Sequence, residues 1–80
     1  MPDFTKPFTL HVDASDVAIG ATLTQSYNSV DMPISYYSKR LNKTEARWSI
    51  YERELFAIIC ALGKWRCYIV DRPTTVHTDH

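Results

Sequence analysis

The stretch PFTLHVDAS, residues 7–15, decides the fold, because apolar and polar residues alternate along it. Phe8, Leu10 and Val12 share one face of an extended strand, and Asp13 lies on the other face at the end of the strand. A carboxylate at the end of a strand in an open mixed sheet is well placed to hold a metal ion or a substrate. Taken alone, the stretch favours a structural role, in which Asp13 begins the turn by hydrogen bonding to the backbone. Other residues must therefore decide whether this acid is functional.

Length and composition favour one ordinary domain. The chain has 80 residues, of which 45% are hydrophobic and 22% charged, close to the size at which a single core becomes marginal. Nine Lys and Arg balance nine Asp and Glu, so any site for a polyanion has to be local. The longest apolar stretch, residues 58–62, is too short to span a bilayer, and residues 1–6 lack the apolar segment of a signal peptide. We therefore expect an intracellular protein with no membrane partner.

Two further strands are expected after the first. Apolar and polar residues alternate at 18–25, which predicts a second strand that pairs with the first through a short turn. After a polar loop at residues 26–31, residues 32–38 are expected to form a third strand. Pro33 predicts an edge position for the third strand, because proline cannot donate to a sheet ladder. Gly20 predicts either a bulge or a close backbone approach. Together these segments predict three antiparallel strands.

One long helix is expected after a polar connection at residues 39–47. Ser49 and Glu52 form a capping box, so the helix should begin near Ser49. Cys60 and Cys67 would lie about 10 Å apart along this helix, too far for a disulfide, and are expected to be reduced. One apolar stripe recurs at spacings of three and four residues and should pack on the sheet: Tyr51, Leu55, Ile58, Leu62, Trp65 and Ile69.

The helix should end at Asp71 and Pro73, before a fourth strand at residues 74–79. A helix that is apolar on two sides needs two packing partners, and these residues supply one. We therefore expect the chain to be a fragment of a longer polyprotein or of a decayed element. The second apolar flank consists of Phe56, Ile59, Cys60, Gly63 and Cys67.

The predicted topology brings three acids together. A helical crossover usually returns a strand parallel to the one it left, so Asp13 and Asp79 would end neighbouring strands, where a cation would relieve their repulsion. Glu54 lies at the edge of the sheet-facing surface of the helix, with a salt bridge to Arg47 or in the neighbourhood of Arg53 as its structural alternative. Glu52 is used for capping. Oxygen ligands with room for water favour Mg²⁺ or Mn²⁺ over zinc and suit phosphoryl chemistry.

Two other groups of residues have a functional and a structural interpretation. His11 with Asp13 and His77 with Asp79 resemble paired metal ligands, but residues two apart on a strand share a face automatically, and a structural or solvent-facing histidine is the favoured interpretation. A basic cluster before the helix could contact nucleic-acid phosphates, and a merely solvated loop explains it equally well. This cluster consists of Lys39, Arg40, Lys43 and Arg47.

The chain resembles the ribonuclease H domain of reverse transcriptases from gypsy-type long-terminal-repeat retrotransposons. The resemblance covers nearly the whole chain in the expected order. Its motifs are KPF at residues 6–8, VDASD at 12–16, IGA at 19–21 with Gln25, PI at 33–34, YYSKRL at 36–41 with Glu45, WS at 48–49, EREL at 52–55, AI at 57–58, AL at 61–62, KWR at 64–66 with Tyr68, and TDH at 78–80.

This resemblance implies a metal-dependent nuclease. The family hydrolyses the RNA strand of an RNA–DNA hybrid with two divalent ions, which activate a water and stabilise the leaving 3′ oxygen. Asp13, Glu54 and Asp79 match its first three acidic ligands, and we assign Asp13 as the ligand that bridges the two ions. The implied partners are the hybrid and a polymerase domain of the same polyprotein, in a cytoplasmic retrotransposon particle or in the nucleus.

The chain departs from the family pattern in one respect. The pattern includes a fourth acid, a further strand and at least one more helix after the motif that ends here at His80. The competing hypothesis is therefore a catalytically inactive relic, or a module that binds nucleic acid or another partner through the same fold. The resemblance therefore implies an α/β, ribonuclease H-like domain at residues 1–80 that is incomplete at its C-terminus. We expect three antiparallel strands and a fourth parallel to the first, with one long crossover helix.

Overall fold

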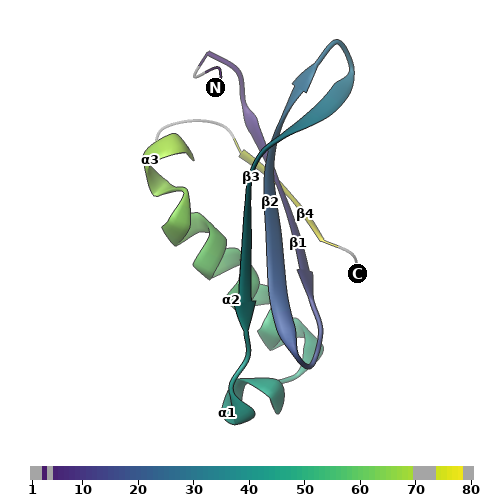
Figure 1. Cartoon of the computed structure of the whole chain (residues 1–80), viewed down its shortest axis with the longest axis vertical. Coiled ribbons are helices and arrows are strands. Elements are labelled where there is room, and N and C mark those ends of the chain that lie inside the picture. The colour runs from purple at the N-terminus through teal and green to yellow at the C-terminus, as the bar shows by residue number, and fades with distance from the viewer. Residues whose placement is uncertain (1–2, 4, 70–73, 79–80) are drawn as a thin grey trace.

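The computed structural model describes the chain except for residues 1–2, 4, 70–73 and 79–80. Its elements are β1 (Phe8–Ala14), β2 (Ala18–Tyr27), β3 (Val30–Arg40), α1 (Lys43–Ala46), α2 (Ile50–Lys64), α3 (Arg66–Ile69) and β4 (Thr74–Thr78) (Figure 1). The four strands form one sheet in the order β3-β2-β1-β4. β2 pairs antiparallel with both β1 and β3, and β4 pairs parallel with β1. The mixed sheet predicted from the sequence is confirmed.

The two hairpins close through short turns. In the first, the Ser15 N–H donates to the Ala18 carbonyl at 2.9 Å, and the Ser15 hydroxyl accepts from the Val17 N–H at 3.2 Å. In the second, Asn28 and Ser29 have φ values of 53° and 67°, and they alone separate β2 from β3. A turn with two positive φ values matches the twist of paired strands. The polar loop expected at residues 26–31 is therefore wrong, because most of it belongs to the strands.

The irregularity in the sheet lies on the edge strand β3. Pro33 is on this edge, as predicted, and the register of β2 against β3 shifts between Leu23 and Thr24, which face Ser35 and Pro33. Gly20 was expected to mark a bulge or a close approach. It marks neither among the described residues, because a Cβ added there would meet the Tyr37 carbonyl oxygen at an ordinary 3.9 Å. The shift occurs at Pro33, which has no N–H to continue the ladder.

A buried amide ties the start of the chain to β2. The Gln25 side chain is fully buried and accepts a hydrogen bond from the Asp3 N–H at 2.8 Å. Its amide nitrogen donates to the Asp3 carbonyl at 2.6 Å and to the Lys6 carbonyl at 3.2 Å, and the Tyr27 hydroxyl donates to its oxygen. A buried amide is tolerated when its donors and acceptor are satisfied. Gln25 therefore anchors the segment before β1.

Helices α1 and α2 each begin with a capping box. The predicted box of Ser49 and Glu52 is confirmed at the start of α2. A second box, formed by Asn42 and Glu45, starts the short helix α1, where a polar connection without a helix was expected. Reciprocal capping satisfies backbone donors at both ends of the box, which stabilises even a single turn. The asparagine and the glutamate three residues later were the signal that could have identified α1.

The predicted long helix is divided in two. α2 ends at Lys64, and its C-cap Trp65 has φ −105° and ψ 22°, outside the helical region. α3 follows at Arg66–Ile69. Gly63 weakens the last turn of α2 because glycine has a low helix propensity. Asp71 and Pro73, expected to end the helix, lie outside the described residues.

The face of α2 that packs on the sheet differs from the predicted stripe. Tyr51, Leu55 and Leu62 of that stripe are 77%, 56% and 37% exposed. Trp65 is buried as predicted, and Ile58 and Ile69 are partly buried against the core. The buried centre is formed by Ala57 and Ala61 with Trp65. Small side chains let the helix approach the sheet closely, whereas periodicity weighs large apolar residues more heavily. From the second predicted flank, Phe56 and Cys60 pack on the core, but Ile59, Gly63 and Cys67 are exposed.

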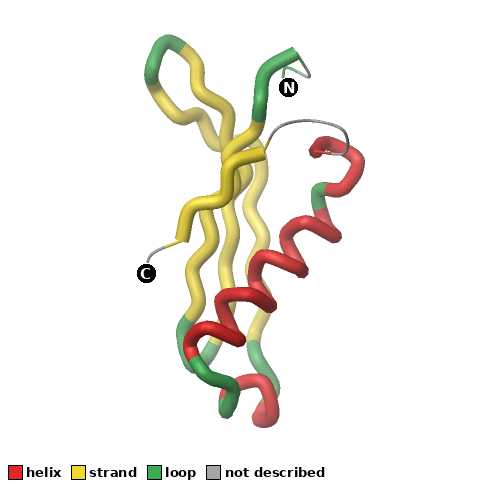
Figure 2. Tube along the Cα trace, turned by 180° about the vertical axis from the view of Figure 1, so that it is seen from behind, coloured by secondary structure: helices red, strands yellow, loops and turns green. Residues whose placement is uncertain are grey.

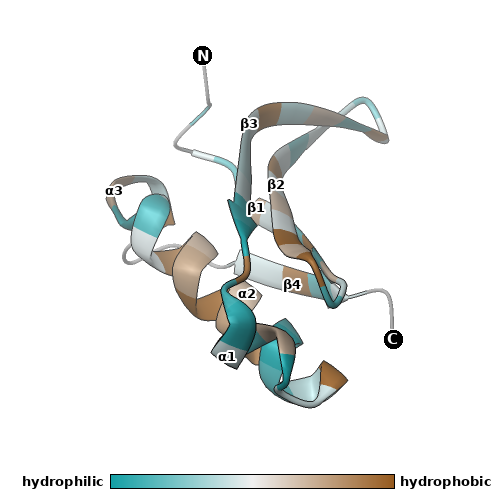
Figure 3. Ribbon diagram, turned by 60° about the horizontal axis from the view of Figure 1, so that its bottom comes forward, coloured by the Kyte–Doolittle hydropathy of each residue, from teal (hydrophilic) through white to brown (hydrophobic). Residues whose placement is uncertain are grey.

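The helices cover one face of the sheet and leave the other open (Figure 2). The core lies between α2 and the sheet, with Phe8, Leu10 and Val12 of β1 and Ile19 and Leu23 of β2 at its centre. Figure 3 shows hydrophobic residues along α2, whereas α1 is hydrophilic. Cys60 and Cys67 are free thiols, as expected. No helix among the described residues is long and apolar enough to cross a membrane.

Candidate functional site

Asp13 occupies the predicted position near the carboxyl end of β1. Its side chain belongs to the open face of the sheet and is exposed, and its backbone pairs with Gly20 of β2. One carboxylate oxygen accepts a hydrogen bond from the Ala14 N–H at 2.9 Å. This local bond is of the kind that the structural interpretation of Asp13 predicts. The exposed position also leaves the carboxylate accessible to a ligand.

The two glutamates at the start of α2 have different surroundings. Glu52 is exposed, and its carboxylate accepts a hydrogen bond from the Ser49 N–H at 2.9 Å, which lowers the pKa of this carboxyl group. Glu54 is partly buried, and its Oε2 atom is shielded from solvent. The capping role predicted for Glu52 is confirmed. Glu54 therefore lies closer to the sheet than Glu52, as the helical geometry predicted.

The fold places Asp13 and the start of α2 at one end of the molecule. In Figure 1, the carboxyl end of β1 lies at the end of the molecule where α2 begins. β4 runs parallel to β1, and Thr78 pairs with Val12. Asp79, the third predicted ligand, lies outside the described residues. Within residues 3, 5–69 and 74–78, no group of three His, Cys, Asp or Glu side chains could hold a metal ion. The set of Asp13, Glu54 and Asp79 therefore stays a prediction.

An open hollow of about 530 Å³ lies on the uncovered face beside Asp13. Its floor includes Gly20, which pairs with Asp13 on one side and with Ser38 on the other. Because glycine has no side chain, the hollow extends between the two neighbouring strands. Its walls carry aromatic, imidazole and hydroxyl groups. The lining includes His11, Asp13, Thr22, Tyr36, Ser38 and His77.

The hollow contains a histidine pair that sequence reasoning treated as two separate residues. His11 and His77 pair in the parallel register of β1 and β4, and their rings stack with centroids 5.2 Å apart. The Oδ2 atom of Asp31 lies 3.7 Å from Nε2 of His11. The signal was present in the sequence, because LHVDA and VHTDH carry the same His-x-Asp spacing. Parallel strands that align the acids also align the histidines.

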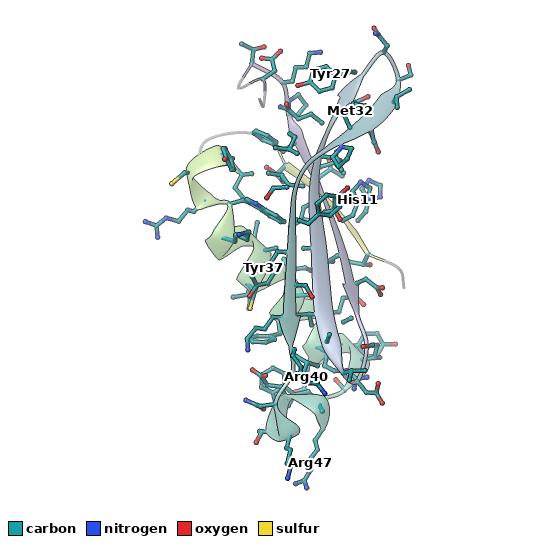
Figure 4. All side chains as sticks on the ribbon, viewed as in Figure 1. His11, Tyr27, Met32, Tyr37, Arg40 and Arg47 are labelled. Atoms are coloured by element: carbon teal, nitrogen blue, oxygen red, sulfur yellow. The ribbon has the colours of Figure 1, made fainter. Side chains whose placement is uncertain are left out.

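Three of the four residues in the predicted basic cluster are free to meet a ligand. Arg40 ends β3, Lys43 begins α1, and Arg47 is its C-cap, and all three are exposed. Figure 4 shows Arg40 and Arg47 at the end of the molecule where α1 lies. Lys39 is partly buried, pairs with Glu45 at 3.8 Å and lies 5.8 Å from the centre of the Phe56 ring. Lys39 is therefore engaged within the protein.

The sequence matches a known protein family over nearly its whole length. A family model described as "RNase H-like domain found in reverse transcriptase" matches residues 3–80. The chain belongs to this family. Among its relatives are two Drosophila melanogaster proteins, the retrovirus-related Pol polyproteins from transposons opus and 412, and the Schizosaccharomyces pombe transposon Tf2-3 polyprotein. They are 49%, 44% and 40% identical over 80, 79 and 81 residues. These relatives fit the gypsy-type resemblance seen in the sequence.

The family match covers only a small part of each relative. The alignments include 99%, 99% and 98% of this chain but 8%, 6% and 6% of the three polyproteins. Foamy viral protease-reverse transcriptase shares the fold. In its complex with double-stranded DNA the TM-score is 0.86 at 21% identity, over 100% of this chain and 16% of that chain. For its complex with an RNA/DNA hybrid, the TM-score is 0.80 and the sequence identity 21%. That alignment covers 100% of this chain and 11% of the viral chain. At this identity the likeness shows the fold alone.

Proposed function

We propose that the chain contributes metal-dependent hydrolysis of the RNA strand of RNA–DNA hybrids, as the ribonuclease H domain of a retrotransposon reverse transcriptase. The observation that carries this proposal is the parallel pairing of Val12 with Thr78. Asp13 follows the first of these residues and Asp79 follows the second. Ligands collect outside the carboxyl ends of strands in open sheets, so acids at these two positions suit a shared site.

The donor set suits hard cations. Asp13, Glu54 and Asp79 offer only carboxylate oxygens, which favour Mg²⁺ or Mn²⁺, and Asp13 is our choice for the ligand shared by two ions. Two such ions, when bound, activate the attacking water and stabilise the leaving 3′ oxygen. The chain itself supplies the negative charge that attracts the ions. The partly buried Glu54 also has a restricted side chain, which favours a fixed ligand position.

The exposed basic residues suit a role in positioning the substrate. Arg40, Lys43 and Arg47 can contact phosphates, which fixes the orientation of a duplex without reading its sequence. The hybrid as substrate is supported by the foamy viral enzyme of the same fold, which binds an RNA/DNA hybrid. The Pol polyprotein relatives support a polymerase domain as partner. We place this activity in the cytoplasmic particle of the element, with the nucleus as a second location.

A second function is favoured by a specific observation. The exposed cations Arg40, Lys43 and Arg47 belong to the part of the chain that the structure describes, whereas Asp79 of the carboxylate set does not. A chain that keeps the fold and the exposed cations but lacks a complete set of ligands would bind the hybrid without cleaving it. Catalysis and binding must therefore be measured separately.

The decisive experiment is cleavage of a labelled RNA strand in a hybrid with Mg²⁺ or Mn²⁺. We expect Asp13→Asn and Glu54→Gln to abolish cleavage, because each removes a charged ligand. Asp16→Asn, in the exposed turn three residues after Asp13, and Glu52→Gln are the matched controls and should retain it. Full activity of Asp13→Asn in an otherwise active protein would overturn the assignment. No cleavage by the unmodified chain, together with hybrid binding, would favour the binding module.

Binding of the hybrid is tested by fluorescence anisotropy across salt concentrations. Replacing Arg40 or Arg47 by Ala should weaken binding equally for different sequences and reduce the salt slope by about one for each phosphate that is no longer neutralised. Lys39→Ala is the comparison, because Lys39 pairs with Glu45. A salt slope unchanged by both arginine variants would show that this end of the molecule does not meet the duplex.

A further inference from the structure

His11 and His77 present two imidazoles to solvent on the open face of the sheet. The rings are 5.2 Å apart between centroids and inclined by 24°. The His11 side chain is 41% exposed, and His77 is exposed as well. Each histidine belongs to a paired strand, so the backbone fixes how far apart the rings can move. The pair therefore offers two nitrogen donors on a rigid base.

An acid from a third strand lies beside this pair. Asp31, at the start of β3, places its Oδ2 atom 3.7 Å from Nε2 of His11, within ion-pair distance. A carboxylate next to one nitrogen of an imidazole is the usual arrangement when the other nitrogen binds a metal, because the acid fixes the orientation of the ring. Asp31 is distant from both histidines in sequence, so its position here is a product of the fold.

We propose that His11 and His77 together bind one Zn²⁺ ion, with Asp31 orienting His11. Imidazole nitrogen is a preferred ligand of zinc and a poor one for Mg²⁺, so this site differs chemically from the carboxylate site. Zn–N bonds are about 2.0–2.1 Å long, so the two stacked rings would rotate to direct one nitrogen each toward a common point. Zinc in proteins is usually four-coordinate, so water would complete the coordination of an ion held by two imidazoles.

An ion at this position would join two strands. β4 pairs with β1 and forms the edge of the sheet opposite β3. A ligand that binds only the folded state stabilises it by a free energy that rises with the logarithm of the ligand concentration once this exceeds the dissociation constant. Zn²⁺ would therefore hold the edge strand against β1. This role goes beyond the proposed nuclease function, because it requires neither the hybrid nor the carboxylate ligands.

Calorimetric titration with ZnCl₂ in excess Mg²⁺ tests the site, because Mg²⁺ occupies oxygen ligands. We expect one Zn²⁺ per chain. His11→Asn and His77→Asn should each weaken binding by at least about tenfold, and Asp31→Asn by about tenfold, as is typical for a group that orients a metal ligand. Circular dichroism confirms that each variant is folded. Unchanged binding in either histidine variant would overturn the proposal, because the ion would not bridge the two strands.

Three variants serve as controls for other zinc ligands in the chain. His80→Asn removes the third histidine, Cys67→Ser removes an exposed thiol, and Asp13→Asn removes the neighbouring carboxylate. All three should bind Zn²⁺ as the unmodified chain does, and loss of binding in any of them would move the ion away from the histidine pair.

A thermal measurement needs no variant. The unfolding midpoint of the unmodified chain should rise as Zn²⁺ is added, and a midpoint that stays constant would contradict the proposal. The nuclease activity and the zinc site are tested independently of each other. Hybrid cleavage is measured in Mg²⁺ alone, and zinc binding is measured without nucleic acid.

Discussion

The two faces of the sheet are built from the same strands but carry opposite chemistry. On β1, Phe8, Leu10 and Val12 are buried against the helices, whereas His11 and Asp13 face the open side. Alternation along a strand makes this division unavoidable, because successive side chains point to opposite faces. The covered face holds the fold together, and the open face is free to carry ligands. Substitutions on the two faces should therefore differ in kind.

The same comparison applies to the two sides of α2. The side that meets the sheet is formed by Ala57 and Ala61 with Trp65, whereas Leu55 and Ile59 face away from the core. Here Leu55 and Ile59 are exposed although they are larger and more hydrophobic than the two buried alanines. Size and hydrophobicity alone therefore do not identify the packed side of this helix.

The largest effect is expected from neighbouring residues on opposite faces of β1. Leu10→Ala removes a side chain that is 1% exposed and should destabilise the protein by about 2–5 kcal/mol, the cost of a cavity in a packed core. His11→Ala should change the stability by less than about 0.5 kcal/mol, because the side chain is at the surface. Urea denaturation measures both. Similar losses of stability in the two variants would show that the two faces of β1 contribute equally to the stability of the fold.

In α2, enlarging a small residue should cost more than removing a large one. Ala61→Leu inserts methylene groups where the helix meets the sheet and should destabilise by about 1–3 kcal/mol. Ile59→Ala should stay within about 0.5 kcal/mol, because Ile59 is 58% exposed. Thermal unfolding compares the two variants. A greater loss of stability for Ile59→Ala would contradict the placement of Ala61 on the packed side of the helix.

The buried amide on β2 extends the comparison to polar groups. Gln25→Leu leaves the Asp3 N–H and the Asp3 and Lys6 carbonyls without this partner and should destabilise by about 1–3 kcal/mol. Ser26→Ala, at the next and exposed position, is the control. Denaturation measures the loss of stability, and limited proteolysis shows whether the N-terminal segment has become easier to cleave. Equal protease resistance in both variants would contradict an anchoring role.

A smaller, stabilising effect is expected at the second hairpin turn. Ser29 has a φ of 67°, which glycine adopts without strain. Ser29→Gly should therefore raise the stability by less than about 1 kcal/mol, since glycine also has more freedom in the unfolded chain. Ser26→Gly, within β2, should instead lower it. The midpoints of thermal unfolding show whether each substitution stabilises or destabilises the protein. A loss of stability in both variants would contradict the turn assignment.

The smallest effect concerns the exposed cap of α2. The hydrogen bond from the Ser49 N–H lowers the pKa of Glu52 in the folded state, so ionised Glu52 stabilises the fold at neutral pH. This contribution is lost as the pH falls through the usual value of 4.5 and then through the lowered one. The stability difference between the unmodified chain and Glu52→Gln should therefore be present at pH 7 and vanish in acid. A difference independent of pH would contradict it.

Local signals in the sequence predicted much of the fold. The alternation in β1, the capping box of α2 and the edge position of Pro33 are all confirmed, because each depends on residues close together in the chain. The errors have physical causes. Periodicity could not choose between two apolar flanks of α2, and the turn at Asn28 was missed because it lacks the glycine that marks most such turns.

For the candidate site, the sequence by itself determined the family and the acids that are candidates for metal ligands. Asp13 at the end of an alternating strand, the acids Glu54 and Asp79, and the motifs around them are properties of the chain order. Only the tertiary structure decided which separated residues meet. The parallel register brings His77 to His11, and the fold brings Asp31 beside them. Contacts of this kind depend on how strands pair and turn in space, which the order of residues along one strand does not specify.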